Sequence, residues 1–178
     1  MGSSKSANAL MTKYNYEQKG FHVLIMKPSI DTRDGGTISS RIGISCECFK
    51  FDKDFDLLDY FIKETQKRKI DVVIIDEVQF CTKEQIEQLR AITDYVSVLC
   101  YGLKTNFKSQ LFEGSKRLIE IADNISEIKT VCKCGSKAII NAKVIDGKIV
   151  KDGDEIDIGG NEKYVSLCYK CYKNGILN

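Results

Sequence analysis

Tryptophan is absent from the sequence, and histidine and proline occur once each. No apolar run approaches the roughly 20 residues that a membrane-spanning helix requires, and no signal-peptide core follows the N-terminus. The 27 lysines and arginines nearly balance the 25 aspartates and glutamates and form no basic block. These absences predict a cytoplasmic protein with a small-molecule partner, without membrane association and without a nucleic-acid partner.

Cysteine, by contrast, is frequent, with eight residues in 178. Because the cytosol keeps thiols reduced, metal ligands are a better interpretation than disulfides, although two disulfides remain the alternative. Cys132-x-Cys134 and Cys168-x-x-Cys171 form two close pairs with the spacing of a tetrahedral zinc site. A closed set of four protein ligands makes such a zinc ion structural rather than catalytic.

Apolar runs alternate with amphipathic stretches over the first part of the chain. Unbroken apolar strands that alternate with helices indicate an α/β fold with a parallel sheet covered by helices on both faces. From about residue 130, glycine-punctuated segments are too short for further β-α-β units, so we expect two domains, residues 1–130 and 131–178. The expected strands are 21–26, 72–76 and 96–102, and the expected helices are 56–69 and 82–95. The second helix opens with Thr82, which could cap it, and Gln85 follows three residues later, the pattern of a capping box.

The N-terminus looks like the second half of a phosphate-binding loop. Gly2-Ser3-Ser4-Lys5-Ser6 precedes a helical stretch, as in G-x-x-x-x-G-K-[ST], although Ser4 stands at the second glycine position and the first half of the pattern is absent. In such loops lysine contacts the outer phosphates and the serine hydroxyl joins the Mg²⁺ shell. Taken alone, such a run of small residues at the start of a chain is more often a disordered leader or the remnant of a tag.

Two carboxylates follow the apolar run Val72-Val73-Ile74-Ile75. Asp76 is expected to help hold Mg²⁺, as in the Walker B segment of P-loop proteins. Because consecutive strand residues point to opposite sides, Glu77 would face an acceptor pocket and take the proton of its hydroxyl group. A solvated acidic turn after a strand explains this segment equally well when it is taken alone.

Together, these segments resemble the zinc-containing P-loop (type II) thymidine kinase family, from Met1 almost to the C-terminus. The resemblance implies transfer of the ATP γ-phosphate to the 5′-hydroxyl of thymidine in nucleotide salvage, and a homotetramer. It leaves the preference between thymidine and deoxyuridine open. The motifs that carry it, in the family's order, are MGSSKS, NYEQKG, IDTRDGGTISSRIG, VVIIDEVQF, LCYGLKTNFKSQLFEGS, the two cysteine pairs and IGGNEKYVSLC.

The same resemblance assigns roles to individual residues. Glu77 matches the catalytic base, and Arg33 matches a position near the phosphates, where it would stabilise developing charge. Phe107 matches an aromatic residue that packs on the thymine base, with core packing as the alternative. The loop of residues 159–165 matches a lasso that closes over the nucleoside and holds it largely through backbone groups. The nucleotide and Mg²⁺ residues are Gly2, Ser3, Ser4, Lys5, Ser6, Arg33 and Asp76, and the nucleoside residues are Phe107, Gly160, Tyr164 and Val165.

Family members carry a strand and a glycine before the position of Met1. Such a strand is internal in a parallel P-loop sheet, so we expect this sequence to be an N-terminally truncated form of an active kinase. Two functions from other classes stay open. One is a catalytically inactive relative that binds nucleosides or nucleotides, and the other is a zinc-ribbon protein that binds nucleic acid, against which the near-neutral charge counts.

Overall fold

The computed structural model describes residues 4–30, 36–153 and 163–177. The chain forms two compact units, each described here by itself. The first, the sheet unit, comprises Lys5–Leu103 and Glu113–Asp123. The second, the cysteine unit, contains Lys104–Phe112 and the described residues from Asn124 onward. The domain boundary near residue 130 stays a prediction.

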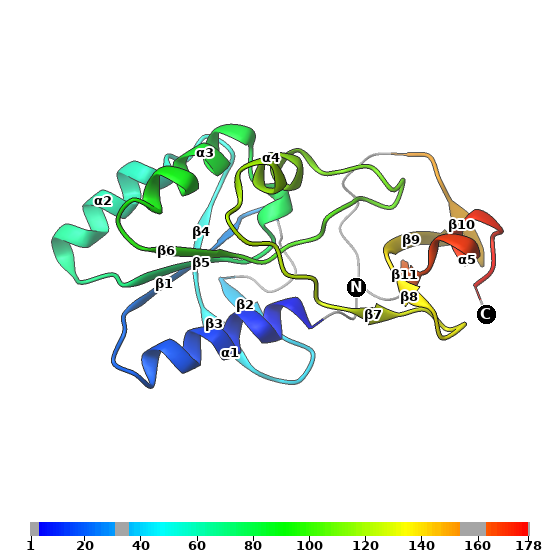
Figure 1. Ribbon diagram of the computed structural model, residues 1–178, viewed down its shortest axis with the longest axis horizontal. Coiled ribbons are helices and arrows are strands. Elements are labelled where there is room, and N and C mark those ends of the chain that lie inside the picture. The colour runs from blue at the N-terminus through cyan, green and yellow to red at the C-terminus, as the bar shows by residue number, and fades with distance from the viewer. Residues whose placement is uncertain (1–3, 31–35, 154–162, 178) are drawn as a thin grey trace. The chain divides into compact units, whose positions relative to one another are not determined.

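The sheet unit is built around a four-stranded sheet of order β4-β1-β5-β6, in which every neighbouring pair is parallel (Figure 1). β2 and β3 form a separate antiparallel hairpin. The prediction of an α/β fold with a parallel sheet is therefore confirmed. The elements are α1 (Lys5–Glu17), β1 (Val23–Pro28), β2 (Thr37–Ser39), β3 (Ser45–Glu47), β4 (Phe49–Phe51), α2 (Leu57–Lys67), β5 (Val72–Ile75), the 3-10 helix η1 (Val78–Phe80), α3 (Lys83–Ile92), β6 (Ser97–Cys100) and α4 (Glu113–Ile121).

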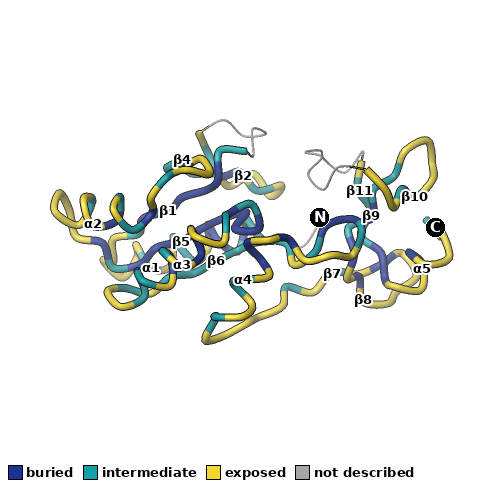
Figure 2. The backbone as a smooth tube through the Cα atoms, turned by 90° about the horizontal axis from the view of Figure 1, so that it is seen from above, coloured by how far each residue is buried: buried dark blue, intermediate teal, exposed yellow. Residues whose placement is uncertain are grey.

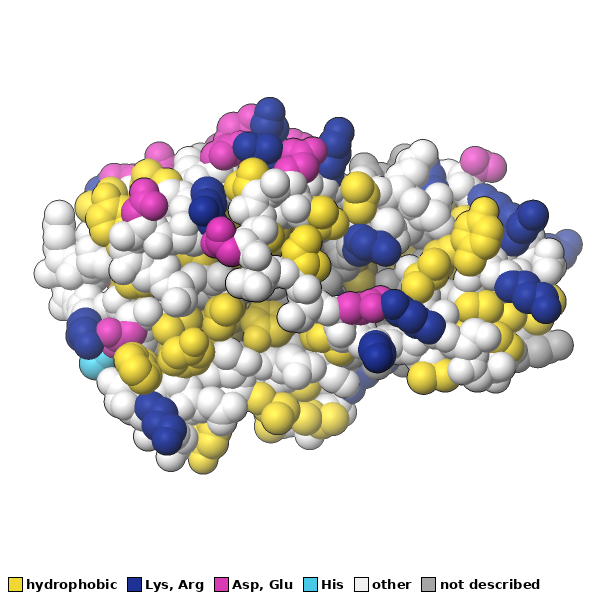
Figure 3. All heavy atoms as spheres, in the orientation of Figure 1, with side chains coloured by type: hydrophobic (Ala, Val, Ile, Leu, Met, Phe, Trp, Pro, Cys, Tyr) yellow, Lys and Arg dark blue, Asp and Glu magenta, His cyan; other side chains and the backbone are white. Residues whose placement is uncertain are grey.

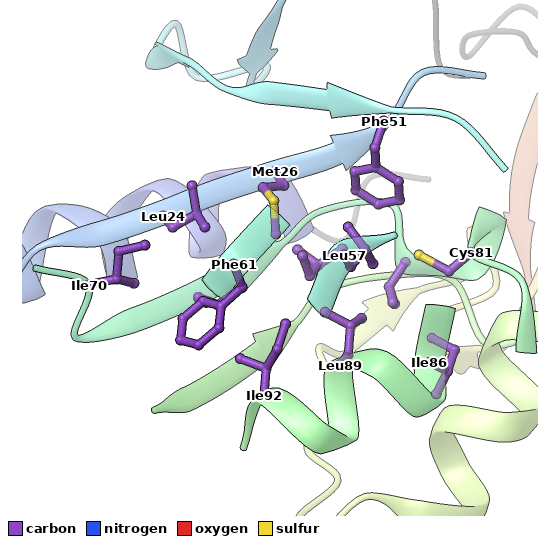
Figure 4. Close-up of a cluster of buried hydrophobic side chains, with 13 residues drawn as sticks. Leu24, Met26, Phe51, Leu57, Phe61, Ile70, Cys81, Ile86, Leu89 and Ile92 are labelled. Atoms are coloured by element: carbon purple, nitrogen blue, oxygen red, sulfur yellow. The ribbon is translucent and has the colours of Figure 1, made fainter. Parts of the chain in front are cut away.

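The two faces of this sheet are covered by different helices, because alternate strand residues point to opposite sides. On one face, β1 and β5 pack against α2 and α3, where Phe61 and Leu89 are almost completely buried (Figure 4). On the other face, Ile25 and Ile74 pack with Leu10 of α1. The central strands β1 and β5 are accordingly the most continuously buried part of the unit (Figure 2).

The starts of two helices follow from the capping residues in the sequence. The side chain of Asp56 accepts a hydrogen bond from the backbone N–H of Asp59 and begins α2. Thr82 and Gln85 form a reciprocal capping box at the start of α3, as the sequence predicts. Both helices end before the predicted residue, because the chain becomes extended at Arg68 and turns after Ile92.

The cysteine unit is antiparallel. β9 pairs with β10 on one side and β11 on the other, and β7 pairs with β8. Its small core contains Ile140, Ala142, Leu167 and Tyr172 beside the cysteine pairs. The elements are β7 (Thr130–Val131), β8 (Lys137–Ala138), β9 (Ile140–Ile145), β10 (Lys148–Val150), β11 (Tyr164–Leu167) and α5 (Tyr169–Lys173).

Charged side chains on α3 and α4 are paired rather than segregated by sign. Arg117 contacts Glu87 at 2.6 Å and Glu120 at 2.9 Å, and Arg90 contacts Asp123 at 2.6 Å. Figure 3 shows acidic and basic side chains interspersed over these helices. Among the described helices, none is long and apolar enough to cross a membrane.

Candidate functional site

The N-terminus of α1 meets the carboxyl end of β5. Lys5 is the first helical residue, and Ser6 Oγ donates a hydrogen bond to Asp76 Oδ2 at 2.7 Å. The residue before the helix, Ser4, has a φ of 53°, in the left-handed region that glycine adopts most easily. A helix N-terminus, a hydroxyl and a carboxylate thus lie together, and these groups suit phosphate and its divalent cation.

The carboxylate of Asp76 is buried, with 2% of the residue exposed. This burial, reinforced by the neighbouring carboxylate of Glu77, raises the pKa of Asp76 to about 6. Hydrogen bonds from Ser6 and from the Glu77 backbone N–H, and the charge of Lys5, act in the opposite direction. A divalent cation would favour the ionised carboxylate further, so the donor set fits Mg²⁺.

Glu77 does not continue the strand. β5 ends at Ile75, and Glu77 has a φ of 54° and a ψ of 36°, the left-handed conformation. Its carboxylate accepts a hydrogen bond from Gln79 Nε2 at 2.5 Å, whereas Asp76 accepts from Ser6. The two carboxylates therefore contact different partners, and a turn separates them rather than the expected alternation of strand side chains.

The four paired cysteines come together in the cysteine unit. The sulfur atoms of Cys132, Cys134, Cys168 and Cys171 all lie within 4.8 Å of one another. The sulfurs of Cys134 and Cys168 are 3.7 Å apart, close to the edge of about 3.8 Å of a tetrahedron with metal–sulfur bonds of about 2.3 Å. All eight cysteines are free in this structure. Four thiolate donors in this arrangement fit zinc.

Comparison with known proteins identifies the family. A family model described as "Thymidine kinase" matches residues 1–172. A "Thymidine kinase" of Photorhabdus laumondii subsp. laumondii is 43% identical over 183 residues, which cover 99% of this chain and 90% of the relative. A "Thymidine kinase" of Rhodopirellula baltica is 41% identical, covering 99% and 85%, and one of Haemophilus influenzae is 42% identical, covering 97% and 92%. The chain belongs to the thymidine kinase family.

Membership of the thymidine kinase family supports the kinase interpretation over both alternatives, the inactive binder and the zinc-ribbon protein. A kinase must bind phosphate, a divalent cation and an acceptor hydroxyl, and the groups at the end of β5 are of kinds that suit these ligands. Several expected residues of the thymidine kinase site lie outside the described residues, and their roles stay predictions. They are Gly2, Ser3, Arg33 and Gly160.

Three expected nucleoside residues of the thymidine kinase site belong to the cysteine unit. Phe107 is buried, with Lys143 Nζ 5.4 Å from its ring centroid, and its carbonyl accepts a hydrogen bond from the Tyr172 hydroxyl at 2.9 Å. Tyr164 and Val165 are half-buried in β11, and Val165 packs against the core of the unit. Their contacts with a nucleoside remain predictions, and a contact from Val165 would come from its backbone.

Sequence reasoning missed the residues that support Glu77. Gln79 is 2% exposed, and its Oε1 accepts a hydrogen bond from the Leu103 backbone N–H at 3.0 Å. A Cβ atom added at Gly102 would lie 2.8 Å from Gln79 Oε1. The only sequence signal was the position of Gln79 inside the motif VVIIDEVQF, two residues after the expected base.

Proposed function

We propose that this chain is a thymidine kinase that transfers the γ-phosphate of ATP to the 5′-hydroxyl of thymidine in nucleotide salvage. The observation that carries the proposal is the hydrogen bond between Ser6 and Asp76, which joins the N-terminus of α1 to the carboxylate after β5. Glu77 follows directly and offers a second carboxylate with separate partners.

In the proposed reaction, the phosphates of ATP lie at the N-terminus of α1, and Lys5 contacts the outer phosphates. Ser6 and Asp76 would hold Mg²⁺, which neutralises charge on the phosphate oxygens. Glu77 accepts the proton of the 5′-hydroxyl while the hydroxyl oxygen bonds to the γ-phosphorus. The bond between the γ-phosphorus and the oxygen that leaves with ADP breaks in the same step. Arg33 would add positive charge near the transferred group.

The nucleoside is proposed to lie against Phe107 and the segment containing Gly160, Tyr164 and Val165. The four cysteines would hold a structural zinc ion, which stabilises a unit whose own apolar core is small. A homotetramer in the cytoplasm, with a P-loop domain of residues 1–130 and a zinc-bearing module of residues 131–178, completes the proposal. Light scattering of the purified chain checks the tetramer.

The test is ATP-dependent phosphorylation of thymidine and deoxyuridine by the purified chain, followed by separation of the nucleoside monophosphates. A version extended upstream by the strand and glycine that the resemblance implies is measured beside it. The variant Glu77→Gln is nearly isosteric and cannot accept the proton, so we expect its kcat to fall about 10²- to 10⁴-fold. Its KM for thymidine should stay close to that of the unsubstituted chain.

Two other outcomes would replace the proposal. Thymidine binding by calorimetry without turnover in either version would indicate an inactive nucleoside binder. Binding to DNA or RNA that weakens steeply with salt, without thymidine binding, would indicate a nucleic-acid-binding protein. Unchanged kcat in Glu77→Gln, with phosphorylation intact, would leave the kinase function standing but remove Glu77 as the base.

A further inference from the structure

Gln79 is a completely buried amide that connects Glu77 to a different part of the sheet unit. It lies in η1, two residues after Glu77, with 2% of its surface exposed. Its Nε2 donates to Glu77 Oε2 at 2.5 Å, and its Oε1 accepts from the Leu103 backbone N–H at 3.0 Å. Both ends of one amide side chain are therefore engaged.

The direction of this amide is determined by chemistry. A backbone N–H can only donate, so the oxygen of the Gln79 amide has to face Leu103. The NH₂ group of the same amide then has to face Glu77, whose ionised carboxylate only accepts hydrogen bonds. Leu103 thus sets the orientation of Gln79, and Gln79 presents a donor to the carboxylate.

Close packing keeps this arrangement in place. A Cβ atom at Gly102 would lie 2.8 Å from both Gln79 Oε1 and Val78 Cγ1, so only glycine lets the chain before Leu103 approach η1 this closely. On its other side, the carbonyl of Leu103 accepts a hydrogen bond from Ser115 Oγ of α4 at 2.6 Å. Leu103 is held by both η1 and α4 and has little freedom to release Gln79.

We propose that Gln79 is a positioning residue that holds the carboxylate of Glu77 in one orientation for the reaction. The inference rests on the proposed function, because it assumes that Glu77 acts on the acceptor hydroxyl. Glu77 has a flexible side chain on a left-handed backbone, and its bond to Gln79 restricts the rotation of the carboxylate. A misplacement of about 1 Å in a reacting group can reduce a rate about 10²-fold.

The variant Gln79→Met tests this role, because methionine has a similar size but no amide donor. Gln85 provides the matched control. It is also 2% exposed, and its Nε2 donates to the carbonyls of Asp52 at 2.7 Å and Phe55 at 3.2 Å. Gln85→Met therefore removes an equally buried amide that has no bond to Glu77, and it reports the cost of losing such an amide for stability alone.

The experiment compares kcat, KM for both substrates and thermal stability between the unsubstituted chain and the two variants. Gln79→Met should lower kcat about 10- to 100-fold, with each KM changed by less than about twofold. Gln85→Met should lower the melting temperature about as much as Gln79→Met does, while its kcat stays within about twofold of that of the unsubstituted chain. Gln79→Leu also lacks the amide donor, and it should show the same loss of kcat if Gln79→Met does not fold.

Each outcome decides the matter. A folded Gln79 variant with kcat within about threefold of the unsubstituted chain would overturn the positioning role and leave the kinase function intact. An equal loss of kcat in Gln85→Met would overturn it too, because stability alone would then explain the effect. If the unsubstituted chain bound thymidine without phosphorylating it, the proposed function would fail first and the positioning role with it.

Discussion

Replacing Gly114 by alanine should destabilise the sheet unit, although alanine is the better helix former. Gly114 is the second residue of α4, where the helix crosses η1. An added Cβ atom would lie 2.6 Å from the carbonyl oxygen of Cys81, 2.8 Å from that of Val78 and 3.2 Å from that of Gln79. Backbone carbonyls of a tight turn cannot rotate away as a flexible side chain can, so α4 or η1 has to move.

Overpacking of this kind costs typically up to about 3 kcal/mol. Exchanging glycine for alanine within a helix contributes up to about 1 kcal/mol in the other direction. The net loss for Gly114→Ala should therefore be about 2 kcal/mol, which corresponds to a fall in melting temperature of about 4–8 °C in a chain of this size. Urea denaturation followed by circular dichroism measures the difference in unfolding free energy.

Gly36 supplies the control for this experiment. Among the described residues, no atom lies within 4 Å of a Cβ added there, and the φ of Gly36 is not in the left-handed region. Gly36→Ala should change the free energy of unfolding by less than about 0.5 kcal/mol. If Gly114→Ala were as stable as Gly36→Ala, the tight contact between α4 and η1 would be refuted, and the support of Gln79 and Leu103 from α4 would lose its basis.

Three further predictions concern other parts of the chain. Cys171→Ser should abolish the stoichiometric zinc measured by plasma mass spectrometry and destabilise the cysteine unit by several kcal/mol, whereas Cys46→Ser, outside the cluster, should keep the zinc. Ser4→Gly should raise the unfolding free energy by about 1 kcal/mol by removing strain at a φ of 53°, and Ser4→Ala, which keeps a Cβ atom, should not. Hydrogen bonds from the His22 backbone and the Lys69 side chain lower the pKa of Asp71 to about 2. The ionised form of Asp71 thus stabilises the fold above pH of about 4. The loss of unfolding free energy caused by Asp71→Asn should therefore be largest above that pH and should fade toward pH 2.

The sequence predicted most of the sheet unit because its strands are unbroken apolar runs and its helices carry capping residues. Val72–Ile75 is fully buried, and the capping box of α3 is present as expected. The short strands β2, β3 and β4 have three residues each, too few to establish a periodicity. Helix α4 was not predicted for a different reason. Its second residue is a glycine, which in a sequence indicates a loop or a turn rather than the start of a helix.

In the candidate site, too, groups that lie close together in the sequence were predictable, and most contacts between residues far apart in the sequence were not. The cysteine pairs were predictable because each pair is local in the sequence and metal binding needs only that two such pairs meet. The contact between Ser6 and Asp76 was predictable only through a motif, since 70 residues separate the two. The partners of Gln79 were not predictable, because hydrogen bonds from Leu103 leave no pattern in composition or spacing.

Ser4 and Glu77 both carry backbone strain, but relieving that strain has a different consequence at each residue. Ser4 and Glu77 are two of the four non-glycine residues with positive φ in the described part of the chain, and such a conformation costs about 1–2 kcal/mol for a residue with a Cβ atom. Glycine would remove the cost at either position. At Glu77 it would also remove the carboxylate that Gln79 holds, so strain and the proposed function are inseparable there. At Ser4 the proposed contact with phosphate needs only the backbone N–H, so this strain can be relieved without loss of a functional side chain.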